Sequence, residues 1–219
     1  MYKIRLGLLI SLVCLPSLCL GDLVPFIRAQ QTGSEFDAVF EWGDANNKFR
    51  LTARGQLSSK SDTTKPGLKL SIGKRSWIEH LFVLDYNKDL LLAFETNDGD
   101  EGNGHICRIN STMDSIAWCQ SVAGFNLFAA TGKDTLYLGA IGFVGRLSPE
   151  TGKLIWQHAD LYNKDNTFNI VCPASETDAT ISFHATTGIK GEANKQITLD
   201  RHSGKVIQIA VITDKTVCQ

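Results

Sequence analysis

Short runs of alternating hydrophobic and polar residues, or of clustered apolar and β-branched residues, dominate the sequence. Examples are residues 38–42, 89–94, 135–139 and 196–199. Gly, Asn, Asp and Ser residues separate these runs, and no segment shows the sustained 3.6-residue hydrophobic period of a long amphipathic helix. Short strands between turn residues are typical of all-β proteins, so the pattern predicts an all-β fold.

One hairpin pattern recurs along the chain: a strand ends, a polar turn follows, and a second strand closes on a large residue. Residues 145–156 give the clearest copy. Residues 107–118 align with it without a gap, and residues 199–208 align with Gln in the place of the final Trp. Residues 70–77 form a fourth copy with a shorter turn. A Gly in three of the four turns suits a positive φ.

Two further candidate strands precede each hairpin, which gives four units of about four strands and roughly 40–45 residues. This period is typical of propeller blades. We therefore expect an N-terminal segment over residues 22–35, followed by β-propeller repeats over residues 36–219. Four blades leave three arrangements open: a closed ring, an open partial propeller, or a half that a second chain completes as a homodimer.

Residues 135–156 resemble the repeat of the pyrroloquinoline-quinone-like, or quinoprotein-like, β-propellers. That repeat has an apolar strand ending in Gly, a short turn, a Leu-Asp strand end, Thr-Gly-Lys and a closing Trp; the other three units match it partly. Family members usually have seven or eight blades, so this chain resembles a short version. The resemblance implies structural roles, as packing residues between blades or turn residues, for Trp77, Trp118, Trp156, Gly152 and Gly204.

The first 21 residues have the character of a secretory signal peptide. Two basic residues precede an apolar run over residues 6–20, and Cys19 and Gly21 are small residues suited to cleavage before Asp22. The run is about 15 residues long, short of the ~20 that span a bilayer. We expect cleavage; the alternatives are a retained membrane anchor and a lipidated cysteine.

Charge and hydropathy limit the partners of the mature chain. Without residues 1–21, the 22 basic residues fall to 20 against 23 acidic residues, which gives a net charge of −3. This balance argues against a nucleic-acid partner. No later stretch approaches ~18 consecutive apolar residues, so we expect no membrane span in the mature chain.

Four cysteines remain after cleavage, and an even number in an exported chain favours two disulfides. Cys107 and Cys119 flank a predicted hairpin whose turn is centred near Met113, so they are expected to face each other. Cys172 then pairs with Cys218, the penultimate residue, and fastens the C-terminus. The alternative is that Cys218 bridges two chains in a homodimer.

One loop, residues 97–104, carries an acidic cluster on flexible Gly-rich sequence. Hard oxygen ligands at this spacing suit Ca²⁺, although a Gly occupies the third ligand position of the standard calcium loop. The alternative is a solvated insertion in a hairpin. The calcium hypothesis assigns the ligand role to Asp98, Asp100, Glu101 and Asn103.

Other chemical motifs are missing from the sequence. The five His residues lack metal-ligand spacing, and there is neither a Gly-x-Ser-x-Gly elbow nor a phosphate-binding loop. Quinoprotein dehydrogenases hold their quinone with a pair of adjacent cysteines, which this chain lacks, so we expect no cofactor. Asn110 begins an Asn-Ser-Thr sequon on a predicted turn, which matters only in a eukaryotic host.

These observations favour an exported, non-enzymatic binding or scaffold protein that uses a propeller surface for protein–protein contact. We expect it in the periplasm or outside the cell, or in the secretory-pathway lumen of a eukaryote. The bacterial outer-membrane assembly lipoprotein and the lumenal propeller of the endoplasmic-reticulum membrane complex have similar repeats and act by protein contact. The alternative is a degenerate quinoprotein-like oxidoreductase or another propeller-based enzyme.

Overall fold

The fold is known from a computed structural model, which describes residues 23–44, 48–62, 64, 67–123, 127–132, 134–158, 161, 170–187 and 192–213. Strands dominate these residues and form four antiparallel sheets, and the short 3-10 helix η1 (Glu35–Asp37) precedes the first complete sheet. Each sheet contains four strands that are consecutive in the sequence. We call these four groups the first to fourth blades.

The blades follow one another along the chain. The first contains β4 (Val39–Gly43), β5 (Lys48–Thr52), β6 (Gln56–Ser59) and β7 (Leu68–Lys69). The second contains β8 (Trp77–Tyr86), β9 (Asp89–Asn97), β10 (Gly102–Ile109) and β11 (Ile116–Ala123). The third contains β12 (Phe128–Thr131), β13 (Leu136–Ala140), β14 (Phe143–Leu147) and β15 (Leu154–His158). The fourth contains β16 (Ile170–Glu176), β17 (Thr180–Thr186), β18 (Asn194–Asp200) and β19 (Val206–Ile212).

A hydrophobic core lies between each pair of neighbouring blades, because alternate residues of each strand face the adjacent sheet. Phe40 of the first blade and Phe94 of the second share one core. A second core joins the second and third blades, and a third joins the third and fourth through residues such as Tyr137 and Phe183. The all-β, propeller-like fold predicted from the alternation is confirmed.

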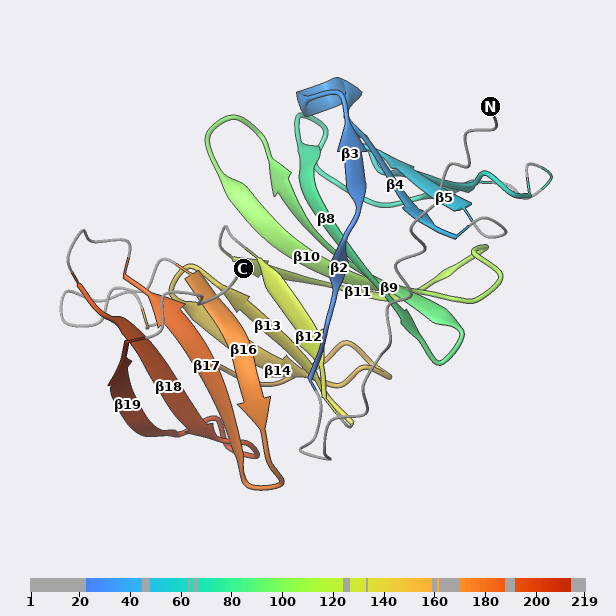
Figure 1. The fold of residues 1–219 in the computed structure, drawn as a ribbon. Coiled ribbons are helices and arrows are strands. Elements are labelled where there is room, and N and C mark those ends of the chain that lie inside the picture. The colour runs from blue at the N-terminus through green and yellow to red at the C-terminus, as the bar shows by residue number, and fades with distance from the viewer. Residues whose placement is uncertain are drawn as a thin grey trace, which may run out of the picture.

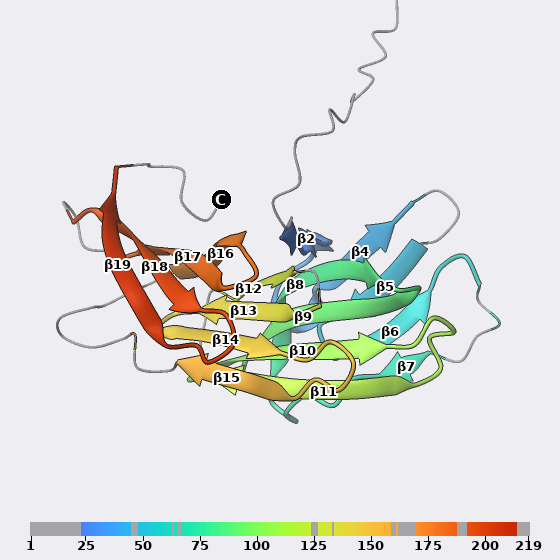
Figure 2. The ribbon, with the colours of Figure 1, turned by 90° about the horizontal axis from the view of Figure 1, so that it is seen from below.

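The four blades form an open arc. Figures 1 and 2 show them side by side in chain order, with the first and fourth blades at opposite ends. Among the described residues, no core cluster joins these two blades. The structure is therefore a partial propeller and not a closed ring.

Both end blades turn a polar face outward. In the first blade, Glu41 pairs with Arg50, and Arg50 with Ser58, on the face opposite its core. In the fourth blade, Thr198 pairs with the exposed Gln208 on the face opposite its core, whereas Ser182, the partner of Thr198 in β17, is buried. Polar outer faces are what terminal units of a stacked array need in water.

The segment before residue 36, outside the predicted repeats, takes part in three sheets. We call residues 23–32 the strap. Its strand β1 (Val24–Pro25) pairs with β12, β2 (Ile27–Arg28) pairs with β8, and β3 (Gln30–Thr32) pairs with β4. The side chains of Phe26 and Ala29 between these strands are buried in two of the cores. The strap thus covers sheet edges that would otherwise present unpaired backbone groups.

Trp77 packs against the core between the first and second blades, as expected, but its predicted place at the end of the first unit is wrong. Trp77 begins β8 of the second blade, where its ring meets that of Phe36 at a centroid distance of 4.7 Å. The first blade ends earlier, with the two-residue strand β7. Nor does Gly73 adopt a positive φ, whereas Met113 does, at 57°, in the hairpin of residues 107–118.

In the part of the chain that the structure describes, no helical segment has the length and apolar character that crossing a bilayer requires.

Candidate binding groove and inter-blade contacts

The junction between the second and third blades is built around Trp118. Arg108 lies opposite Trp118 in the β10–β11 pair. Both side chains donate to the carbonyl oxygen of Pro149 in the next blade, at 3.1 Å from Arg108 Nη1 and 3.0 Å from Trp118 Nε1. The indole packs directly on Gly152, whose φ of +68° and close approach leave no room for a side chain.

The junction between the third and fourth blades repeats this arrangement. Arg146 lies opposite Trp156, and both donate to the carbonyl oxygen of Arg201, at 2.8 and 2.9 Å. Gly204, with a φ of +72°, lies against the indole. Trp156 is buried and Trp118 half-buried. The structure therefore places Trp118 and Trp156, and Gly152 and Gly204, in equivalent positions, as their alignment predicts.

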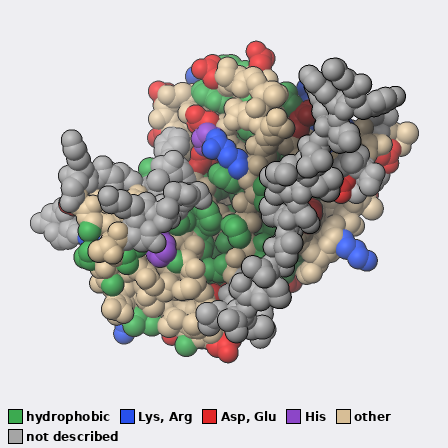
Figure 3. All heavy atoms as spheres, viewed as in Figure 1, with side chains coloured by type: hydrophobic (Ala, Val, Ile, Leu, Met, Phe, Trp, Pro, Cys, Tyr) green, Lys and Arg blue, Asp and Glu red, His purple; other side chains and the backbone are tan. Residues whose placement is uncertain are grey.

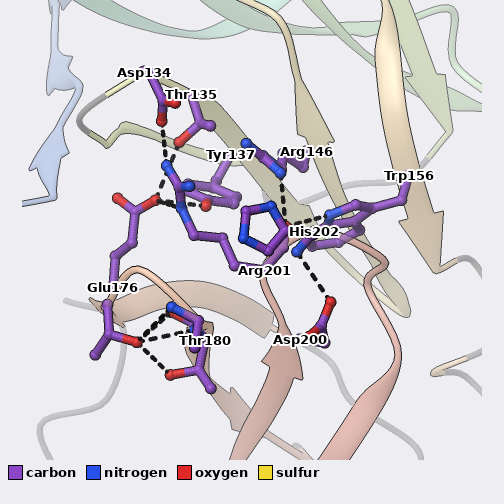
Figure 4. A network of polar contacts seen from close by, with 12 residues as sticks. Asp134, Thr135, Tyr137, Arg146, Trp156, Glu176, Thr180, Asp200, Arg201 and His202 are labelled. Carbon is purple, nitrogen blue, oxygen red and sulfur yellow. Dashed lines mark hydrogen bonds and ion pairs between the residues drawn. The ribbon is translucent and has the colours of Figure 1, made fainter.

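A buried ion-pair network strengthens the last junction (Figure 4). The Arg201 guanidinium donates to Glu176 at 2.5 Å and also contacts Asp134. Tyr137 donates its hydroxyl to the same Glu176 oxygen at 2.8 Å, and Thr135 does so at 3.3 Å. Glu176 and Arg201 both belong to the fourth blade, so the contacts that join the two blades are those from Asp134, Thr135 and Tyr137 of the third.

Cys107 and Cys119 form a disulfide, as predicted. They are direct partners in the β10–β11 pair, with Cα atoms 4.1 Å apart. Cys172 is buried on β16, whereas Cys218 lies outside the described residues. The Cys172–Cys218 bond therefore stays a prediction.

The acidic loop is a tight connection between β9 and β10. The Asp98 carboxylate accepts hydrogen bonds from the backbone amides of Asp100 and Glu101, at 3.1 and 2.8 Å, and these amides lower the pKa of Asp98. Asn103 lies on β10, opposite Thr96. Among the described residues, no group of three or more His, Cys, Asp or Glu side chains is placed to hold a metal ion. The hydrogen bonds within the turn explain an acidic residue at position 98. The calcium hypothesis stays untested.

Asn110 organises the turn of its hairpin. Its Nδ2 group donates to Thr112 and Asp114 at 2.7 and 2.6 Å, and its Oδ1 accepts from the amides of Asp114 and Ser115. A glycan on Nδ2 would replace one of these donor hydrogens. The sequon residue therefore has a structural role in the turn.

A groove of about 700 Å³ lies between the first and second blades. The strap, β4, β5 and β8 supply its walls. Trp42 and Phe49, cross-strand neighbours with ring centroids 5.7 Å apart, form part of one wall. Ile27 of the strap, 70% exposed, and Val83 of β8 supply aliphatic surface.

The polar groups of the groove come from Arg28, Gln30, Glu41, Asp44 and Asp85. The indole N–H of Trp42 is buried, and no hydrogen-bond acceptor meets it within the described part of the chain. Because this atom has almost no accessible surface, a ligand in the groove would reach it only after the side chains around it move.

Arg28 also ties the strap to the second blade. Its Nη2 lies 3.0 Å from His80 Nδ1, and because a guanidinium only donates, Nδ1 is the acceptor and Nε2 carries the hydrogen. His80 Nε2 lies 3.9 Å from the buried Glu95 carboxylate, which also accepts a bond from the Leu127 amide. Burial raises the pKa of Glu95, an effect that the Leu127 amide and His80 partly offset.

None of the groove residues was singled out from the sequence as a site. The described lining contains no Ser, Thr, Cys, Lys or His, and its ionisable groups are the Arg28 guanidinium and the carboxyl groups of Glu41, Asp44 and Asp85. Figure 3 shows hydrophobic side chains gathered in a hollow near the middle of this face of the molecule. The aliphatic and aromatic lining of the groove suits contact with an apolar group.

No family model matches the sequence, and no curated protein matches it. Among solved structures, a europium-containing methanol dehydrogenase is similar with a TM-score of 0.45 and 16% identity, over 60% of this chain and 24% of that enzyme. BamB from Moraxella catarrhalis is similar with a TM-score of 0.47 and 12% identity, over 88% of this chain and 64% of BamB. This chain thus spans less than two thirds of either protein, and its fold assignment rests on its own sheet topology.

Proposed function

We propose that this chain is an exported, non-enzymatic binding protein, and that the groove between its first two blades receives a segment of a partner protein. The observation that carries the proposal is the exposed aliphatic side chain of Ile27 in the same groove as the aromatic pair of Trp42 and Phe49. A peptide offers apolar side chains to this surface and backbone groups to the polar residues of the lining.

Export is supported by the Cys107–Cys119 disulfide, because such bonds persist in oxidising compartments. Binding is supported by the aliphatic and aromatic lining of the groove. A quinoprotein-like oxidoreductase remains the competing function. An absorption band of the purified protein at wavelengths longer than that of its aromatic side chains would indicate a bound quinone and favour that alternative.

Site-specific photo-crosslinking in cells tests the groove. A photoreactive amino acid at Ile27 is expected to capture one discrete partner, and Trp42→Ala is expected to reduce that product at least tenfold. Ile155 is the control position, because it is 48% exposed on β15 and does not line the groove. Equal capture from both positions, or a product insensitive to Trp42→Ala, would contradict the proposal.

A further inference from the structure

The outer strand of the fourth blade is an exposed apolar edge. β19 is the last strand of its sheet, and none of its seven residues is charged. Ile207, Ile209 and Val211 alternate along it with 57%, 40% and 68% of their surface exposed. Ile209 and Val211 pair with Ile197 and Lys195 and lie on one face of the sheet. Ile207 lies at a register shift, between the pairs Val206–Leu199 and Gln208–Thr198.

The outer edges of the other three blades are better protected. β7 has only two residues. β11 is fixed by its disulfide to β10 and exposes the small residues Ala117 and Ser121. β15 has five residues, of which Trp156 is buried. Proteins normally blunt edge strands by shortness, charge, covering or a β-bulge. Within the described residues β19 is neither short nor charged, and its register shift lies at its first residues, between Val206 and Gln208.

We propose that β19 pairs antiparallel with β19 of a second copy of this chain, about a two-fold axis at Ile209. In this register Ile209 of one copy faces Ile209 of the other, and Ile207 faces Val211. Each exposed aliphatic side chain then gains an aliphatic cross-strand neighbour, with Cβ atoms ~4.5–5.5 Å apart. The pairing joins two four-stranded sheets into one eight-stranded sheet.

The symmetry of the segment favours a second copy over another occupant. An isologous interface needs one surface that complements itself, and the row of Ile207, Ile209 and Val211 does so around its central residue. The absence of charge in β19 removes like-charge repulsion across the axis. By contrast, the outer faces of the end blades are polar, so a dimer that closes the propeller ring would bury hydroxyl, amide and charged side chains.

Light scattering coupled to gel filtration tests the interface with the whole mature chain. The wild-type protein is expected at twice the chain mass, and Ile209→Lys at the mass of one chain, because two Lys side chains would meet at the axis. Ile155→Lys, an equally exposed aliphatic on another outer strand, is expected to leave the dimer intact. Unchanged circular dichroism and melting would show that each variant is folded.

Cysteine crosslinking tests the register. Ile209→Cys is expected to give a disulfide-linked dimer on a non-reducing gel, since residues facing each other across antiparallel strands lie within disulfide range. Ile155→Cys is expected to give none. A wild-type monomer at the highest soluble concentration, or a dimer that survives Ile209→Lys and is lost in Cys218→Ser, would overturn the proposal.

Discussion

At the scale of single residues, Trp118 and Trp156 each join two blades by the same three contacts. The ring fills the space above a Gly, its N–H meets a backbone carbonyl, and an Arg from the neighbouring strand shares that carbonyl. Because the ring and the polar bonds act at one place, truncation there removes both packing and hydrogen bonding.

Trp156→Ala is therefore expected to lower the free energy of unfolding by about 3–5 kcal/mol, as for other core aromatics. Ile155→Ala is the matched control, because Ile155 is the adjacent residue on β15 and is half exposed; its cost should stay below about 1 kcal/mol. Urea titrations followed by circular dichroism measure both. Equal effects of the two substitutions would contradict the inter-blade role of Trp156.

Gly204→Ala separates backbone strain from collision with the indole. Gly204 and Gly99 both have positive φ, which costs an L-residue roughly 1–2 kcal/mol. A Cβ on Gly204 would lie 2.6 Å from Trp156 Cδ2, whereas a Cβ on Gly99 would meet nothing within 4 Å. Gly204→Ala should cost about 1–3 kcal/mol more than Gly99→Ala in the same titration. Similar costs would mean that the Trp156 contact is loose.

The ionisation of Tyr137 predicts a loss of stability at alkaline pH. Burial raises the pKa of Tyr137 to about 12, and Glu176 adds to this while Thr135 opposes it. The contribution of the protonated Tyr137 side chain to the free energy of unfolding is therefore complete below about pH 10, where the phenol is protonated in the unfolded chain too. This contribution is lost as the pH rises toward 12. The melting temperature of the wild type should fall more steeply between about pH 10 and 12 than that of Tyr137→Phe. An equal fall in both proteins would contradict a role for Tyr137 ionisation.

At the scale of elements, the disulfide between β10 and β11 stabilises one hairpin. Replacing both Cys107 and Cys119 by Ser opens a loop with a sequence separation of 12 residues, for which chain entropy predicts a loss of about 3 kcal/mol. Denaturant titration of the double variant measures the loss. Peptide mapping without reduction should recover the two cysteines as one linked peptide, and recovery as free thiols from an oxidising compartment would contradict the bond.

The hairpins could be predicted from the sequence because their signals are local. The turn residues around Met113 fix the register that brings Cys107 and Cys119 together, and the copies ending at Trp118 and Trp156 share that spacing. Trp77 follows Gly73 at a similar distance and imitates the pattern, although β7 ends the first blade before it. The local signal cannot show which of two neighbouring strands a Trp belongs to.

The strap escaped prediction for a different reason. Its strands are two or three residues long and their side chains are exposed, so no alternation marks them. Their pairing with β12, β8 and β4 depends on which sheet edges are free, and this follows only from the tertiary structure.

At the scale of the whole molecule, the groove and the shape of the arc were beyond the sequence. Ile27, Trp42 and Val83 come from three separate segments, and none has a motif that nominates a site. Four repeats are equally consistent with a ring, an arc or half of a dimer. An open arc leaves the outer faces of its two end blades in water, so these faces should be polar. Which residues form these faces becomes clear only when the strand pairing within each end blade is known.

The open arc is tested most directly by small-angle X-ray scattering of the mature chain, measured on Ile209→Lys so that any dimer through β19 is removed. We expect the scattering of a curved particle whose first and fourth blades do not touch, in agreement with the arrangement in Figures 1 and 2. A curve that fits a closed ring, with the first blade packed on the fourth, would contradict the structure described here.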